Sequence, residues 1–188
     1  MKKLLISIAL CMMSAVMSYA QNTNDGEFHF KTFIELMNWR APGRQLSFYS
    51  DYAAKAGLSQ VFELKEGDEL YYVWSKNVTY QKGHMTETYG KVGDETRALN
   101  VDLTPNKKGL YVPVSITLIF RDAKEQKRFR DEGIEYGCVE NPDMYYETVD
   151  PTWKNVNSIK YIKHKTNTSW RYIFFYEKDG MQMCTFWY

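Results

Sequence analysis

Aromatic and β-branched residues supply most apolar positions of this chain, and turn-forming residues recur between them at short intervals. That pattern is typical of β-strands joined by tight turns. The clearest pair of strands is 170–176 and 181–188. Between them stands Asp179-Gly180, a preferred sequence for a two-residue hairpin turn, where both central positions need positive φ. Further strands are predicted at 61–64, 70–74, 78–81, 98–103, 111–120, 134–139 and 158–164.

Two segments are predicted to be helices instead, the first from the three- and four-residue spacing of its apolar residues and the second from the signals at its two ends. The first covers 45–56, and the second covers 123–132. Asp122 can cap the second helix, and Glu125 three positions later can bond back to its first amide. The apolar face of the first helix consists of Leu46, Tyr49, Tyr52, Ala53 and Ala56.

Each predicted helix is followed by a glycine and an aliphatic residue, at Gly57 and at Gly133, and this pairing commonly ends a helix. The surroundings of the two helices are also alike. The similar segments are 61–63 with 70–72 after the first helix, and 138–140 with 144–146 after the second. A weak internal duplication is one interpretation, and chance similarity between two ordinary helix–strand units is the other. The sequence therefore predicts an α+β fold, with a mainly antiparallel sheet and two helices.

The first twenty residues have the pattern of a secretory signal peptide. Lys2 and Lys3 precede the apolar run 4–16, small residues stand before Gln21, and the chain is polar from there onward. Cleavage is expected after Ala20, which leaves 21–188 as a single globular domain. Such a domain would be exported, to a periplasm or to the exterior of the cell.

The charge of the exported part is close to neutral. Two of the 24 basic residues lie in the first twenty positions, which contain no acidic residue. The remaining chain therefore has 22 basic and 23 acidic residues, and its net charge is −1. This balance argues against nucleic acid as a partner and against a polybasic membrane anchor. No second apolar run approaches the roughly 20 residues of a membrane helix, so stable membrane insertion is not expected.

Two cysteines remain after the signal peptide, because Cys11 lies within it. In an exported protein, Cys138 and Cys184 are candidates for a disulfide, which would close a long loop and stabilise the fold by about 3–5 kcal/mol. The alternative is two buried free thiols that behave as small apolar groups.

Signals for catalysis are sparse. A thiolate at Cys138 with His164 as its base is one candidate, because a cysteine nucleophile needs a neighbouring imidazole. Paired carboxylates are another, as in glycoside hydrolases. The acidic clusters are Glu63, Glu66, Asp68 and Glu69, and Glu140, Asp143 and Glu147. The three histidines, His29, His84 and His164, show no metal-ligand spacing, so neither a metal nor a cofactor is predicted.

The aromatic content points to binding instead of catalysis. Aromatic residues number 29 of the 168 that follow Ala20. Exposed Trp and Tyr offer a large rigid contact area together with a hydrogen-bonding group. We expect a non-catalytic module for a protein, peptide or glycan ligand, for example a periplasmic inhibitor or an immunity-type protein. A secreted hydrolase and a small outer-membrane β-barrel are the alternatives. The candidate binding residues are Tyr72, Trp74, Trp170, Tyr172 and Trp187.

Overall fold

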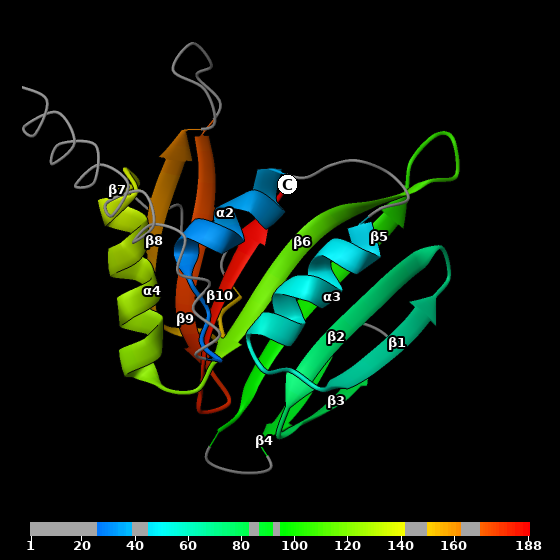
Figure 1. The fold of residues 1–188 in the computed structure, drawn as a ribbon, viewed down its shortest axis with the longest axis horizontal. Coiled ribbons are helices and arrows are strands. Elements are labelled where there is room, and N and C mark those ends of the chain that lie inside the picture. The colour runs from blue at the N-terminus through cyan, green and yellow to red at the C-terminus, as the bar shows by residue number, and fades with distance from the viewer. Residues whose placement is uncertain (1–25, 39–44, 83–86, 92–94, 142–149, 163–169) are drawn as a thin grey trace, which may run out of the picture.

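A computed structural model describes residues 26–38, 45–82, 87–91, 95–141, 150–162 and 170–188 (Figure 1). The helices in these segments are α2 (Phe30–Asn38), α3 (Gln45–Lys55) and α4 (Ala123–Glu135). The strands are β1 (Gln60–Glu66), β2 (Glu69–Lys76), β3 (Val78–Lys82), β4 (Glu87–Lys91), β5 (Arg97–Pro105), β6 (Tyr111–Phe120), β7 (Val139–Glu140), β8 (Lys154–Ile162), β9 (Trp170–Lys178) and β10 (Met181–Trp187). The mostly antiparallel α+β class is confirmed, but the described residues contain three helices and not the predicted two.

Eight of the strands form one sheet in the order β1-β2-β5-β6-β10-β9-β8-β7, and every neighbouring pair is antiparallel. The strands β3 and β4 form a separate hairpin, which lies between β2 and β5 in the sequence but not in the sheet. The sheet has two halves. Each half follows a helix and runs through four strands in sequence, and the halves meet where β6 pairs with β10.

This repeated order of elements is what a duplication would produce. The first pair of similar segments, 61–63 and 138–140, includes residues of β1 and β7, the two edge strands of the sheet. Of the second pair, 70–72 lies in β2, whereas 144–146 lies outside the described residues. The duplication itself stays a prediction.

All three helices pack on one face of the sheet, which Figure 1 shows toward the viewer. The core between helices and sheet is rich in aromatic rings, as a cluster around Phe129 of α4 illustrates. Its ring lies 5.3 Å from those of Phe30 and Phe33 in α2, and 6.4 Å from that of Phe175 in β9. Burying one such side chain contributes about 2–3 kcal/mol.

The opposite face of the sheet carries a second apolar cluster, which no helix of the described segments covers. Over the half that contains β2 and β5, the β3–β4 hairpin covers this face. Tyr80 and Tyr89 of the hairpin lie 5.1 Å apart, and Tyr80 packs 6.3 Å from Phe62 of β1. The Nδ2 group of Asn100 donates a hydrogen bond to the Tyr89 hydroxyl at 2.9 Å. The hairpin is therefore fixed to the sheet by both apolar and polar contacts.

The Asp122 cap of α4 and the final hairpin turn are confirmed, whereas the Glu125 carboxylate bonds back to the Arg121 amide and not to the first amide of the helix. Asp122 caps α4 by accepting a hydrogen bond from the Glu125 amide at 2.8 Å. Asp179 and Gly180 join β9 to β10 with positive φ values of 52° and 73°, the backbone that a type I′ turn needs.

The predicted end of the second helix is wrong. Gly133 lies inside α4, and the chain leaves the helix at Gly137, whose φ is +108°. Gly133 is needed for another reason: a Cβ atom there would lie 2.7 Å from Ile159 and 2.9 Å from Phe30. The missing side chain lets α4 approach β8 and α2 closely. As a result, the strand predicted at 134–139 is helical at its start and contributes only Val139 to β7.

The helix missing from the prediction, α2, had a recognisable pattern. Its buried residues Phe30, Phe33, Ile34 and Met37 recur at spacings of three and four. Two strands also differ from the prediction. The strand β4 was not predicted, and β8 begins at Lys154 and not at 158. No helix within the described ranges is long and apolar enough to cross a membrane.

Candidate ligand-binding site

Two of the five predicted binding residues face the helices. Trp74 is only 4% exposed, and its ring packs 6.3 Å from Tyr49 of α3. Tyr72 stacks on Trp74 at 5.8 Å and is half-buried, with a pKa raised by burial and by the nearby Glu63 carboxylate. Trp74 is therefore a core residue. The side chain of a third predicted residue, Trp170, lies outside the part of the chain that can be described.

The other two predicted residues, Tyr172 and Trp187, are exposed on the face without helices. Their exposed fractions are 38% and 41%. The neighbours Ile173 in β9 and Phe186 in β10 belong to the helix-side core, so the strand pleat turns Tyr172 and Trp187 to the opposite face. Because Ile173 pairs with Phe186, these two aromatic residues lie across from each other on adjacent strands.

Three further rings support this exposed pair. The Trp187 ring lies 5.1 Å from the Phe174 ring in an edge-on arrangement. It also lies 5.9 Å from the Trp153 ring, and the planes of Trp187 and Trp153 differ by only 6°. Trp153 in turn stacks on Tyr176 at 3.6 Å. We call these five residues, Trp153, Tyr172, Phe174, Tyr176 and Trp187, the aromatic platform. Sequence reasoning missed Trp153, because it precedes β8 in a turn and no periodic pattern marks it.

The platform is also fixed by hydrogen bonds to the centre of the sheet. The Tyr176 hydroxyl lies 2.8 Å from Thr185 Oγ1, which lies 2.9 Å from Thr117 Oγ1. All three residues are buried. In contrast, within the described segments neither the indole N–H of Trp187 nor the hydroxyl of Tyr172 has a hydrogen-bond partner in the protein. These two polar groups are free to bind a ligand.

Polar residues continue the row that contains Trp187 and Tyr172. On one side, Trp187 pairs with Ser115 of β6, and Ser115 pairs with Asp102 of β5. The Ser115 hydroxyl donates a hydrogen bond to the Asp102 carboxylate. On the other side, Tyr172 pairs with Lys160 of β8. Asp102 and Lys160 are both half-buried. An aromatic centre thus has an acidic group on one side and a basic group on the other.

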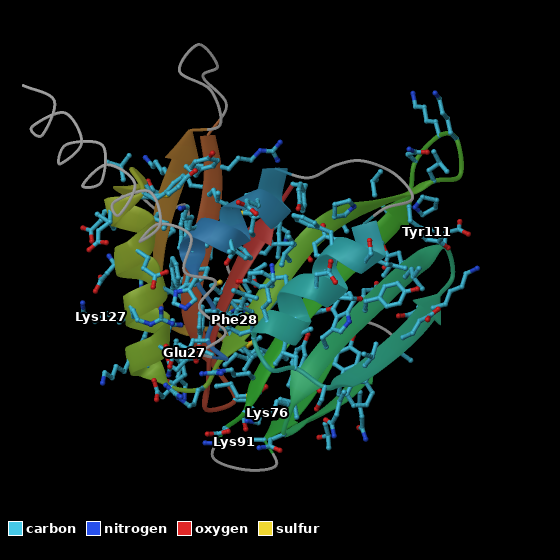
Figure 2. All side chains as sticks on the ribbon, viewed as in Figure 1. Glu27, Phe28, Lys76, Lys91, Tyr111 and Lys127 are labelled. Atoms are coloured by element: carbon cyan, nitrogen blue, oxygen red, sulfur yellow. The ribbon has the colours of Figure 1, made fainter. Side chains whose placement is uncertain are left out.

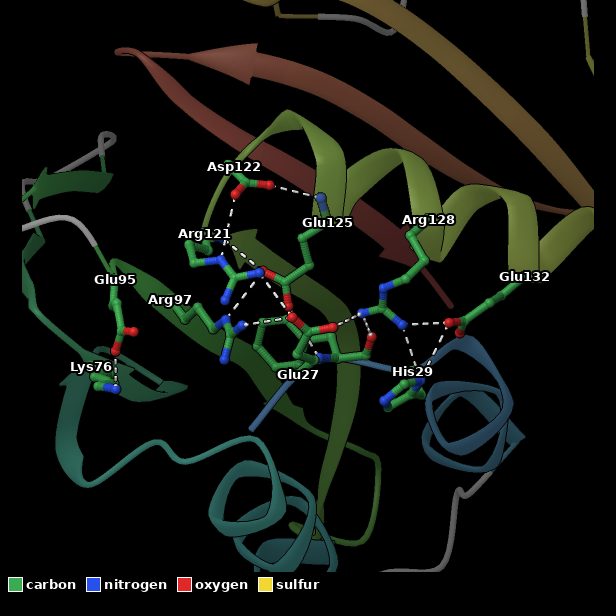
Figure 3. Close-up of polar contacts among 11 residues, drawn as sticks. Glu27, His29, Lys76, Glu95, Arg97, Arg121, Asp122, Glu125, Arg128 and Glu132 are labelled. Atoms are coloured by element: carbon green, nitrogen blue, oxygen red, sulfur yellow. Dashed lines mark hydrogen bonds and ion pairs between the residues drawn. The ribbon is translucent and has the colours of Figure 1, made fainter. Parts of the chain in front are cut away.

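A separate cluster of charges lies on the helix side, where the segment before α2 meets α4 (Figure 3). Figure 2 shows Glu27 and Phe28 of this segment beside α4. The buried carboxylate of Glu125 accepts hydrogen bonds from the Phe28 amide at 3.2 Å, the Arg121 amide at 2.8 Å and Arg97 Nε at 3.1 Å. The side chain thus fixes three separate parts of the chain, which is a structural role.

Glu132 forms the second half of this cluster. Its carboxylate accepts a hydrogen bond from the Phe30 amide at 2.8 Å, lies 3.2 Å from His29 Nδ1, and forms an ion pair with Arg128. Burial raises the pKa of Glu132, but the hydrogen bonds and the Arg128 charge outweigh burial and leave the pKa lowered. These groups are satisfied by one another, so the cluster holds the N-terminal segment against α4.

The predicted disulfide between Cys138 and Cys184 is wrong, since both cysteines are free and buried. Cys138 stands directly before the edge strand β7, whereas Cys184 lies in β10, three strand positions away. At about 4.8 Å per strand, that separation is about 14 Å, against the roughly 7 Å limit for bridged Cα atoms.

The structure also weakens the hypothesis of a cysteine nucleophile. Burial raises the pKa of the Cys138 thiol to about 12, so the group stays protonated at neutral pH. Burial raises the pKa of Cys184 as well. The proposed base, His164, lies outside the described residues, as do Asp143 and Glu147. Within the described ranges, no group of three or more His, Cys, Asp or Glu side chains is placed to hold a metal ion.

The other acidic cluster is divided between two paired strands. Glu63 and Glu66 lie in β1, and Glu69 lies in β2 and accepts a hydrogen bond from the Tyr71 hydroxyl. Asp68 occupies the turn between them. A pocket of about 220 Å³ exists elsewhere, at the start of α4, and includes Arg121. Arg121 is already paired with Glu27 at 2.8 Å. Neither place has a carboxylate pair held across a cleft.

Comparison of the chain with protein-family models, with curated proteins and with solved structures finds no match.

Proposed function

We propose that this protein is an exported, non-catalytic binding module and that the aromatic platform contacts its ligand. The observation that carries the proposal is the exposure of Tyr172 and Trp187, side by side, on the sheet face that no described helix covers. Large aromatic residues with a polar group dominate the energy of binding surfaces, because they bury much area and still form a hydrogen bond.

The rigidity of the platform supports the same proposal. Trp187 packs against both Trp153 and Phe174, and Trp153 is stacked on Tyr176. Rings that are already fixed lose little conformational freedom on binding, so more of the contact energy appears as affinity. The ligand classes are a protein, a peptide or a glycan. An inhibitor or immunity-type protein, which acts by occupying its target, is one concrete form of this function.

Capture of ligands by the immobilised protein tests this proposal. The wild type and the double variant Tyr172→Ala/Trp187→Ala would be incubated with periplasmic extract and culture medium of the source cells. Bound proteins would be identified by mass spectrometry, and bound carbohydrate by monosaccharide analysis. We expect material that the wild type retains and the double variant loses.

The matched control for this experiment is Tyr136→Ala. Tyr136 is 48% exposed but lies at the end of α4, away from the platform. It should retain the same material as the wild type, and circular dichroism should show that all three proteins are folded. Equal capture by the wild type and the folded double variant would exclude the platform as the binding site.

A further inference from the structure

The platform belongs to a row of side chains that crosses the sheet. The row runs from β5 through β6, β10 and β9 to β8, and its members are Asp102, Ser115, Trp187, Tyr172 and Lys160. The four strand intervals span about 19 Å at the usual strand spacing. A ligand that uses the whole row is therefore elongated and lies across the strands.

The chemistry of the row changes along this length. Its centre presents two exposed aromatic rings, whose flat faces suit the C–H-rich face of a pyranose ring. At its flanks, Lys160 carries a positive charge, and Asp102 carries a carboxylate that accepts a hydrogen bond from the Ser115 hydroxyl and has its other oxygen buried. The indole N–H of Trp187 and the hydroxyl of Tyr172 add two hydrogen-bonding groups between them.

From this combination we infer that the ligand is a glycan, bound as an extended oligosaccharide with a sugar ring stacked on Trp187 or Tyr172. This inference rests on the proposed function and specifies its ligand. A sugar ring is apolar on its faces and polar around its rim, so it needs a platform of this kind and no deep pocket. A peptide or protein is the less favoured ligand, because such partners anchor single side chains in apolar pockets. None of the residues lining the pocket at the start of α4 belongs to the row.

Titration with defined oligosaccharides tests the inference. The full chain would be titrated with cellohexaose, chitohexaose, xylohexaose, maltohexaose and an oligogalacturonate, by calorimetry and by indole fluorescence. We expect saturable binding of at least one of them. Trp187→Ala and Tyr172→Ala should each weaken that binding about tenfold, as loss of a central aromatic contact usually does.

Two further variants separate a direct contact from a loss of structure. Trp187→Phe keeps a flat ring and should retain part of the affinity. Tyr136→Ala should bind as the wild type does, because its exposed ring lies outside the row. Thermal unfolding of each variant shows whether the fold is intact, and Tyr172→Ala decides the question if Trp187→Ala is unfolded.

Binding of none of these sugars would overturn the inference, and so would binding that survives unchanged in both folded alanine variants. The capture experiment distinguishes the two levels of failure. If the intact platform captures a protein but binds no sugar, the glycan inference is wrong and the proposed binding function stands. If the platform captures nothing and binds no sugar, both the inference and the proposed function are wrong.

Discussion

At the scale of single residues, the carboxylate of Glu125 has the largest predicted effect on stability. It is buried, pairs with Arg97 at 3.1 Å, and accepts two backbone amides. Glu125→Gln should lower the free energy of unfolding by about 3 kcal/mol, because it leaves the buried Arg97 charge without its nearest partner. The measurement is urea unfolding at neutral pH.

Asp131→Asn is the control for this variant, since it removes an exposed carboxylate from the same helix. Asp131 pairs with Lys127, four residues away, at 2.5 Å. Exposed pairs of this kind contribute about 0.5 kcal/mol or less. Equal midpoints for Glu125→Gln and Asp131→Asn would show that the buried network does not stabilise the fold.

Individual residues also show how far sequence reasoning reaches. The cap at Asp122 was predictable, because it depends on residues three positions apart. The partners of Glu125 were not predictable, because Phe28 is 97 residues away and Arg97 is 28. In the same way, Trp74 and Trp187 both occur in strands with apolar residues at neighbouring positions. Only the structure shows that helices cover Trp74 and that Trp187 is exposed.

Among the elements, α4 depends on the absence of a side chain at Gly133. Alanine in a helix interior is normally more stable than glycine by about 1 kcal/mol. Here the added Cβ would lie 2.7 Å from Ile159 and 2.9 Å from Phe30, both fully buried. We expect Gly133→Ala to destabilise the protein by about 1–3 kcal/mol, because overpacking outweighs the helix propensity. Thermal unfolding of the wild type and the variant shows whether the substitution lowers or raises stability.

A second alanine substitution in the same helix is the control for this change in stability. Lys124→Ala lies in α4 at an exposed position, so it reports helix propensity without a packing change. It should leave stability within about 0.5 kcal/mol of the wild type. A Gly133→Ala protein that is more stable than the wild type would show that α4 can move away from β8 and α2 at little cost.

The contact between α4 and the segment before α2 should depend on pH. The pKa of Glu132 is lowered in the folded protein, so its stabilising contribution is complete above the ordinary carboxyl pKa of about 4.5 and is lost as the pH falls through the lowered value. Glu132→Gln should be less stable than the wild type by about 2 kcal/mol at pH 7. The difference should shrink toward pH 3, as measured by urea unfolding at a series of pH values.

Other carboxylates also titrate in that range, so the informative quantity is the difference between wild type and variant. Asp150→Asn is a useful comparison, because the pKa of Asp150 is lowered mainly by hydrogen bonds from Thr152, in the turn before β8. If the gap between wild type and Glu132→Gln stays constant from pH 7 to pH 3, the ion pairs around Glu132 do not stabilise the folded state.

For the elements, local signals were sufficient in some places and insufficient in others. The periodic helix 45–56 and the Asp179-Gly180 turn were correctly predicted because their determinants lie within a few residues. The helix α2 had an equally clear period but was not identified. The end of α4 was misplaced because a glycine followed by an aliphatic residue commonly ends a helix. Here Gly133 instead permits a close contact between α4 and β8, which only the tertiary fold creates.

At the scale of the whole molecule, the order of strands in the sheet could not be read from the sequence. The similarity between the surroundings of the two helices pointed to two related units, but it did not indicate that β6 and β10 would pair at the centre. That pairing determines which residues share the row with Trp187. The position of the candidate site is therefore a property of the sheet order, although the exposed aromatic residues themselves were among the predicted ones.

The central pairing also predicts how the molecule unfolds. Six residue pairs join β6 to β10, and one apolar core extends under both halves, from Trp74 to Phe175. We therefore expect one cooperative transition. In hydrogen exchange at increasing urea concentration, the slowest amides of β5 and β9 should open with the same free energy. Gly133→Ala, although it acts next to β8, should lower both values equally. A β9 that opens at lower free energy than β5 would mean that the two halves are separate folding units, which share a sheet without sharing their stability.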